Sequence, residues 1–227
     1  MKTTTALLIK HLKDSLCNLP SLMILVIYPA VTFVMLTAMK GEEGMADFFV
    51  PMFAAMHCSF APLVLSSNLL SEEKEKGTLR ALMLAGVSRV KYLASLFCFV
   101  LLSVMATGSV FLLMKPGSAG YTAAFASAMV LGSAVSALIG LCVGICSANV
   151  SAANGIAVPV GLVFALIPML GQFNDSISKA AVFTYSGQLK AVFESGVLSV
   201  NALIVSLSYG AVLSLLLLVL FRRRGLE

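Results

Sequence analysis

Five long stretches without a charged residue constrain this chain more than any other feature. They contain no Asp, Glu, Lys or Arg and cover residues 15–39, 48–71, 92–114, 116–174 and 195–221. A helix that crosses the hydrocarbon core of a bilayer needs about 20 apolar residues. Four stretches therefore fit one crossing each, and the 59-residue stretch fits two with a turn between them. We expect six transmembrane helices, at 20–39, 48–70, 91–114, 122–147, 156–171 and 200–221.

The composition excludes most other fold classes. Hydrophobic residues make up 59% of the 227 residues and charged residues 11%, whereas soluble domains carry about 25% charged residues. A transmembrane β-barrel needs short strands of alternating polarity, and these continuous apolar runs have the wrong pattern for one. The sequence therefore predicts an all-α membrane protein.

The basic residues predict the orientation of the chain. Six spans place both termini on the same side, and if that side is the cytoplasm, cytoplasmic segments hold eleven of the 15 Lys and Arg residues. The outer segments hold Lys40, Lys115, Lys179 and Lys190. The positive-inside rule favours this orientation, so we expect a multi-pass protein of the cell inner or plasma membrane with both termini cytoplasmic. The same distribution accounts for the net charge of +5 without a nucleic-acid partner.

Residues 1–19 are expected to form an amphipathic helix ahead of the first span. At helical spacing, Leu8, Leu12 and Leu16 fall on one side, and Lys10 and Lys13 fall on the other. Such a helix lies in the membrane interface rather than across the bilayer. A frayed soluble tail is the alternative.

A charged segment, 71–90, connects the second and third spans. We expect Thr78 to cap a short helix, Gly86 to end that helix and Ser88 to cap the next span. Its apolar residues Leu79, Leu82 and Met83 share one face. An exposed apolar face binds a partner or rests on the bilayer surface, and the residues alone leave both open.

Residues 172–199 form the second long segment outside the spans. We expect two short extracellular helices that dip toward the membrane, with Asp175 as a cap and a break at Ser186 and Gly187. Residues 149–155 are expected to form a simple inner turn between the fourth and fifth spans.

The run Glu-Lys-Glu-Lys-Gly-Thr-Leu at 73–79, followed by Val-Ser-Arg at 87–89, resembles the type-two ABC transporter permeases. These are the membrane subunits of ATP-driven exporters, and the resemblance implies that 1–227 form one permease domain. It also implies that 71–90 contain a cytoplasmic coupling helix. Many members have proline where Gly86 stands and an acidic residue where Arg80 stands. The implied ATPase-coupling residues are Glu72, Glu73, Glu75, Lys76, Gly77, Thr78, Leu79, Arg80, Leu82 and Met83.

The resemblance also implies partners. The sequence contains no Gly-rich phosphate loop that ends in Gly-Lys-Ser or Gly-Lys-Thr, so ATP and Mg are expected in a separate ABC ATPase subunit. A second copy of the chain or a homologous permease would complete the pathway, surrounded by membrane lipid. The expected cargo is hydrophobic or amphipathic, most simply a drug or an antimicrobial peptide, as in resistance or peptide export.

Within the spans, His57 is the one strongly polar titratable side chain near a membrane midplane, which makes it a candidate functional residue. A neutral histidine bonded to a neighbouring carbonyl is the alternative. In the resembled family the second and fifth spans border the cavity, so Phe53, Met56, Phe60 and Phe164 are candidate pathway residues. Ordinary helix packing is the alternative for these four.

Small residues recur every four positions along the fourth span, at Gly132, Ser136, Gly140 and Gly144. This stripe predicts close approach of another helix. Cys142 and Cys146 lie in the same apolar span without nearby His or carboxylate residues, so we expect packing rather than a metal site.

Two other functions stay open on sequence alone. A scaffold for a cytoplasmic partner also needs an exposed helix. An ion-coupled secondary transporter normally needs carboxylates within the membrane, and the expected spans contain none. No constellation of His, Asp, Ser or Cys indicates an enzyme, so we expect a transport subunit.

Overall fold

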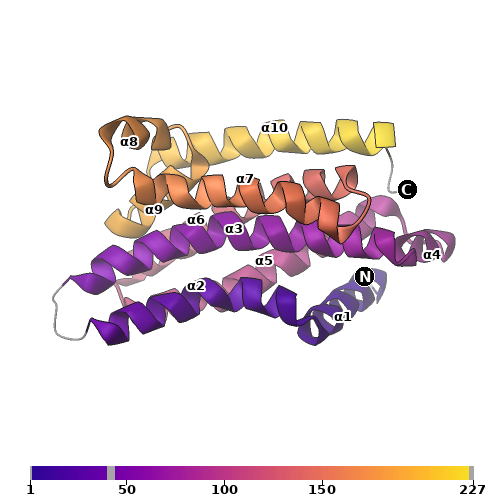
Figure 1. The fold of residues 1–227 in the computed structure, drawn as a ribbon, viewed down its shortest axis with the longest axis horizontal. Helices are drawn as coiled ribbons and strands as arrows, with labels where there is room; N and C mark the ends of the chain where they lie inside the picture. The colour runs from indigo at the N-terminus through magenta and orange to yellow at the C-terminus, as the bar shows by residue number, and fades with distance from the viewer. Residues whose placement is uncertain (1, 40–43, 225–227) are drawn as a thin grey trace.

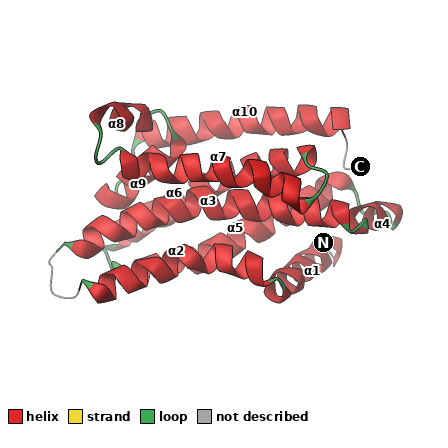
Figure 2. Ribbon diagram, in the orientation of Figure 1, coloured by secondary structure: helices red, strands yellow, loops and turns green. Residues whose placement is uncertain are grey.

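The computed structural model describes residues 2–39 and 44–224, and within these ranges every regular element is a helix (Figures 1 and 2). Lys40, which we counted among the outer basic residues, lies outside the described residues. The ten helices of the described ranges are α1 Lys2–Cys17, α2 Leu19–Ala38, α3 Met45–Glu75, α4 Thr78–Leu84, α5 Arg89–Met114, α6 Ala119–Cys146, α7 Val150–Leu170, α8 Asp175–Ala181, α9 Tyr185–Ser195 and α10 Val200–Arg224.

Six of these helices are long and apolar enough to cross a membrane, namely α2, α3, α5, α6, α7 and α10. The expected number of spans and the all-α class are therefore confirmed, and the fold indicates a multi-pass membrane protein. The expected turn at 149–155 is wrong, because α7 already begins at Val150. Asn149 caps it by accepting a hydrogen bond from the Ala152 amide at 2.8 Å.

Helix α3 is the centre of the bundle. In its most apolar 18-residue window 78% of the residues are buried, against 6% for α10. Figure 1 shows α3 between α2 and α7, and it also packs against α5, α6 and α9. The last turn of α3 lies at the end of the bundle where α4 projects, which we call the α4 end.

The small residues of α6 lie where it meets α3 and α9. A Cβ atom on Gly140 would lie 2.1 Å from the Leu63 carbonyl oxygen of α3, and one on Gly132 would lie 2.1 Å from a Leu189 methyl group of α9. Gly144 approaches Leu70 and the Ser67 carbonyl, and the Ser136 hydroxyl lies 2.8 Å from the Tyr185 hydroxyl. This stripe brings α6 close to the central helix.

Two expected features of 172–199 are wrong. The cap of α8 is Asn174, whose side-chain oxygen accepts from the Ser176 and Ile177 amides, rather than Asp175. The break between α8 and α9 falls at 182–184, and Ser186 and Gly187 lie inside α9. The reason is Thr184, whose hydroxyl accepts from the Gly187 amide at 3.2 Å and starts α9 before those two residues.

We predict that Gly140→Ala destabilises the protein by about 1–3 kcal/mol, because the added methyl group meets backbone that cannot rotate away. Gly210→Ala in α10 is the matched control, since a Cβ there has nothing within 4 Å. Thermal unfolding of both variants in the same detergent measures the difference. Equal melting temperatures for Gly140→Ala and the parent would contradict the packing of α6 on α3.

Candidate coupling site at the α4 end

Helix α4 is set between two glycines in the left-handed conformation. Gly77 has φ +68° and lets the chain turn sharply out of α3. Gly86 has φ +85° and ends α4, because its amide bonds the Met83 carbonyl while the Val87 amide bonds the Leu82 carbonyl. Ser88 then caps α5 by accepting from the Lys91 amide. The expected roles of Gly86 and Ser88 are therefore confirmed.

Thr78 does not cap α4, which corrects the sequence prediction. It is the first residue of the helix, and Gly77 occupies the cap position. The Thr78 hydroxyl instead reaches back to α3, where it donates to the Glu73 carboxylate at 2.6 Å. This bond ties the start of α4 to the last turn of α3.

Glu73 joins three helices. It is 7% exposed, and a buried carboxylate requires partners that replace its lost hydration. Lys10 of α1 forms an ion pair with it, while Thr78 of α4 donates to its other oxygen. Burial lowers the pKa of Lys10, but its bonds to Glu73 and Asp14 outweigh burial and leave the pKa raised. The Lys10 ammonium is therefore charged at neutral pH.

Glu72 makes a second link between α3 and the amino-terminal region. Its carboxylate accepts from the Asn18 side-chain amide at 3.2 Å and pairs with Lys76 one turn later in the chain. Asn18 also caps α2, since its oxygen accepts from the Ser21 amide. Glu72 thus holds the junction of α1 and α2 against α3.

Lys74 and Glu75 extend the network to the other side of the bundle. The Lys74 ammonium donates to the carbonyls of Ile145 at 2.9 Å and Ser147 at 2.8 Å, at the end of α6. A cation is favourable there because the last carbonyls of a helix lack partners and carry negative charge. Glu75 accepts from the Val150 amide at 3.0 Å, at the start of α7.

The charged run at 72–76 therefore connects the last turn of α3 to α1, α2, α4, α6 and α7. We call these five residues the α3 junction. Sequence reasoning assigned Glu72, Glu73, Glu75 and Lys76 to partner docking, whereas the structure gives each an interaction within the chain. Pairing with Lys10 and Asn18 was missed because contacts more than 50 residues apart leave no local pattern.

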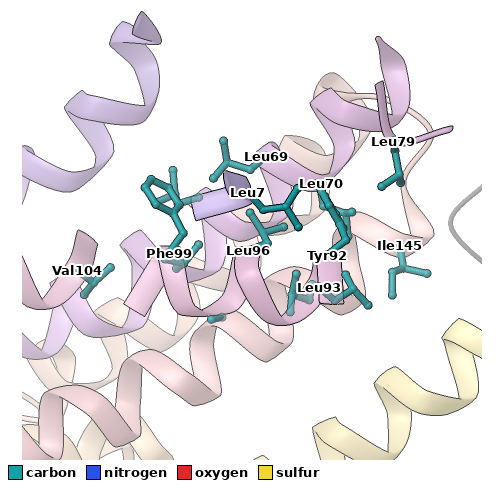
Figure 3. Close-up of a cluster of buried hydrophobic side chains, with 14 of the residues drawn as sticks. Leu7, Leu69, Leu70, Leu79, Tyr92, Leu93, Leu96, Phe99, Val104 and Ile145 are labelled. Atoms are coloured by element: carbon teal, nitrogen blue, oxygen red, sulfur yellow. The ribbon is translucent and has the colours of Figure 1, made fainter. Parts of the chain in front are cut away.

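The apolar face of α4 is not exposed, which corrects a second prediction. Leu79 is 1% exposed and belongs to a buried cluster with Leu70, Tyr92 and Ile145 (Figure 3), while Leu82 and Met83 pack against that cluster. The sequence pattern identifies an apolar face but not what covers it. The outward residues are Arg80, Ala81 and Leu84, and Leu84 is 83% exposed.

A basic hollow of about 580 Å³ lies beside α4. Its lining includes Lys74, Arg80 and Arg89 together with Leu84, and none of the described carboxylates contributes to it. The outward surface of α4 is therefore apolar at Leu84 and positive around it.

Helix α1 turns an unexpected face to the bundle. Leu7, His11 and Ser15, spaced one turn apart, are all buried. Two residues of the expected apolar side, Leu12 and Leu16, are 49% and 59% exposed instead. His11 is 1% exposed and packs against the rings of Tyr92 and Phe99 in α5, at centroid distances of 5.6 and 5.9 Å.

Burial lowers the pKa of His11, while Glu73 acts in the opposite direction and Lys10 in the same one. Folding therefore favours the neutral imidazole. As the pH falls below the ordinary histidine pKa of about 6.5, His11 is protonated in the unfolded chain before it is protonated in the folded one. The contribution of His11 to stability is therefore present above about pH 6.5 and is lost below it.

We predict that His11→Phe reduces the loss of thermal stability between about pH 7.5 and about pH 5.5, because the phenyl ring keeps the aromatic packing without the titration. Melting temperatures of parent and variant across that range test this. The same decline in both proteins would show that His11 does not contribute to it.

We predict that Glu73→Ala lowers the free energy of unfolding by about 1–3 kcal/mol, because it leaves Lys10 and Thr78 without their shared acceptor. Asp14→Ala is the matched control, since it removes the other partner of Lys10 at a side chain that is 52% exposed. Chemical unfolding in detergent measures both. A loss for Glu73→Ala no larger than that for Asp14→Ala would argue against the junction.

The five candidate pathway residues all pack against other residues of this chain. His57 is fully buried, its Nε2 lies 3.1 Å from the Thr107 hydroxyl, and the rings of Tyr28 and Phe111 flank it. Phe53, Met56 and Phe60 pack where α3 meets α7. Phe164 packs on Tyr185, with ring centroids 4.9 Å apart.

In the part of the chain that the structure describes, no three His, Cys, Asp or Glu residues are grouped to hold a metal ion. No protein-family model matches the chain, and no curated protein matches it significantly. The six long apolar helices define a multi-pass helical membrane protein. At one end of its bundle, the α3 junction joins the last turn of α3 to the short projecting helix α4.

Proposed function

We propose that the chain is the membrane permease of an ATP-driven exporter of the type-two ABC class, and that α4 is its coupling helix. One observation carries the proposal. The inner face of α4 is fixed to the bundle by Leu79 and Thr78, whereas its outer residues Arg80, Ala81 and Leu84 are exposed. A short helix that is held on one side and open on the other suits a partner that pushes on it.

The α3 junction provides a route for such a push. Displacement of α4 acts on Glu73 through Thr78, and Glu73 in turn holds α1 through Lys10. Lys74 and Glu75 carry the same displacement to the end of α6 and the start of α7. Because α3 is the most buried of the long helices in the described part of the chain, movement of its last turn is expected to change the packing of the whole bundle.

The partner is expected to be a cytoplasmic ABC ATPase that holds ATP and Mg. The basic hollow beside α4 favours a partner surface with acidic residues, since Arg80 and Arg89 line it and no carboxylate from 2–39 or 44–224 does. The proposal places the α4 end and both termini in the cytoplasm, in agreement with the positive-inside rule. In that arrangement α1 lies in the interface, with Leu12 and Leu16 facing lipid.

A second copy or a homologous permease is proposed to complete the pathway. Helices α2 and α7 are only 22% buried in their most apolar windows and expose Phe33 and Val163. An apolar pathway between two such surfaces suits hydrophobic or amphipathic cargo, such as a drug or an antimicrobial peptide. Phe53, Met56, His57, Phe60 and Phe164 would reach it only after the packing of α3 and α7 opens.

We predict that Leu84→Asp with Arg80→Glu abolishes association with the ATPase while the protein stays folded, because both residues are exposed. The tagged chain is purified in mild detergent from its native host, and co-purifying chains are identified by mass spectrometry. The expected result is an ATPase with a phosphate loop in the parent sample that is lost from the variant.

Val197→Asp is the matched control, because Val197 is 64% exposed and precedes α10 at the opposite end of the bundle. This variant should retain the ATPase. If the parent purifies without an ATPase, or if the α4 variant retains it as the control does, the coupling role of α4 is wrong. Substitution of Leu79 is less informative, since that side chain belongs to the core.

A further inference from the structure

An apolar groove runs along the outside of the bundle between α5 and α10. Its volume is about 380 Å³, which lies in the range of pockets that hold small ligands. Helices α5 and α10 form its walls, and Leu138 and Leu141 of α6 form its floor. Ser214 is the one lining residue with a polar side chain. The groove takes no residue from α2 or α7, so it is separate from the proposed transport pathway between two copies.

Basic residues continue both walls of the groove at the α4 end. On α5, Leu93 lines the groove and Arg89 lies one turn before it. On α10, Leu218 lines the groove and Arg222 lies one turn after it. Residues four apart share a helix face, so the two arginines extend the groove-lining faces beyond the apolar part.

Among the residues that the structure describes, the charges at this end of the groove have no carboxylate partner. Arg89, Lys91, Arg222 and Arg223 are exposed, and none forms an ion pair with a carboxylate of the described ranges. The described carboxylates at the α4 end have other partners. Asp14 and Glu73 pair with Lys10, Glu72 pairs with Lys76, and Glu75 accepts from the Val150 amide. The groove therefore ends in positive charge that the described carboxylates leave available.

We propose that this groove binds one anionic phospholipid. An acyl chain lies along the apolar walls of α5 and α10, and the headgroup phosphate is bound by Arg89 and Arg222. A groove in a membrane-facing surface loses packing contacts unless it is filled, and basic pockets between transmembrane helices select acidic headgroups. The proposal does not depend on the transport function, because it needs only that the α4 end lies at a membrane surface.

The test is native mass spectrometry of the purified full chain with equal amounts of phosphatidylglycerol and phosphatidylcholine that carry the same acyl chains. The parent is expected to retain one phosphatidylglycerol in preference to phosphatidylcholine. Arg89→Gln with Arg222→Gln should weaken phosphatidylglycerol binding about twenty-fivefold, at about fivefold for each basic residue removed. Lys13→Gln with Lys179→Gln is the charge-matched control, because both lysines are exposed elsewhere.

A second pair of variants tests the apolar part. Ala94→Phe fills the groove from an exposed position on α5 and should reduce the binding of both lipids, whereas Ala106→Phe, exposed on α5 outside the groove, should not. Equal retention of the two lipids by the parent overturns the proposal. Lipid binding that is not reduced by Ala94→Phe overturns it as well. Conversion of a dimeric parent to a monomer by Ala94→Phe, with no lipid bound in either, would show that a second copy occupies the groove instead.

Discussion

The buried carboxylate of Glu73 is the interaction on which the α4 end of the bundle depends. A carboxylate that is 7% exposed must replace its hydration, and here it does so with a lysine from α1 and a hydroxyl from α4. Because those partners come from different helices, the requirements of one side chain fix the positions of three elements. Its neighbours Lys74 and Glu75 satisfy helix ends in the same way at α6 and α7.

The second constraint is the close contact of α3 with α6. Van der Waals packing rather than hydrophobic burial drives helix association within a bilayer, so small residues that let backbones approach have a large effect. Gly140 and Gly144 place α6 directly on the backbone of α3. The junction at the end of α3 is thus attached to a helix that is itself tightly held, as the proposed transmission of a displacement requires.

The sequence predicted the elements better than their contacts. Spans were predictable because a helix in lipid must be apolar along its full length, and that pattern is continuous in the chain. The turn at Gly86 was predictable because its conformation favours glycine. The role of Thr78 was mispredicted because a threonine that caps a helix and one whose hydroxyl bonds a preceding helix have the same local sequence. The exposure of Leu79 was mispredicted because the local sequence does not show what covers an apolar face. The partners of Glu73 were hidden because Lys10 lies 63 residues away.

Hydrogen exchange in the parent and in Lys74→Met tests the central claim most directly, which is that the α3 junction connects the helices around it. The substitution removes the bonds of Lys74 to the Ile145 and Ser147 carbonyls. Our account predicts faster exchange at the end of α6 and the start of α7, and also in α4 and α1, which Glu73 of the α3 junction bonds through Thr78 and Lys10. Faster exchange confined to the end of α6 and the start of α7 would show separate local contacts and would contradict the account.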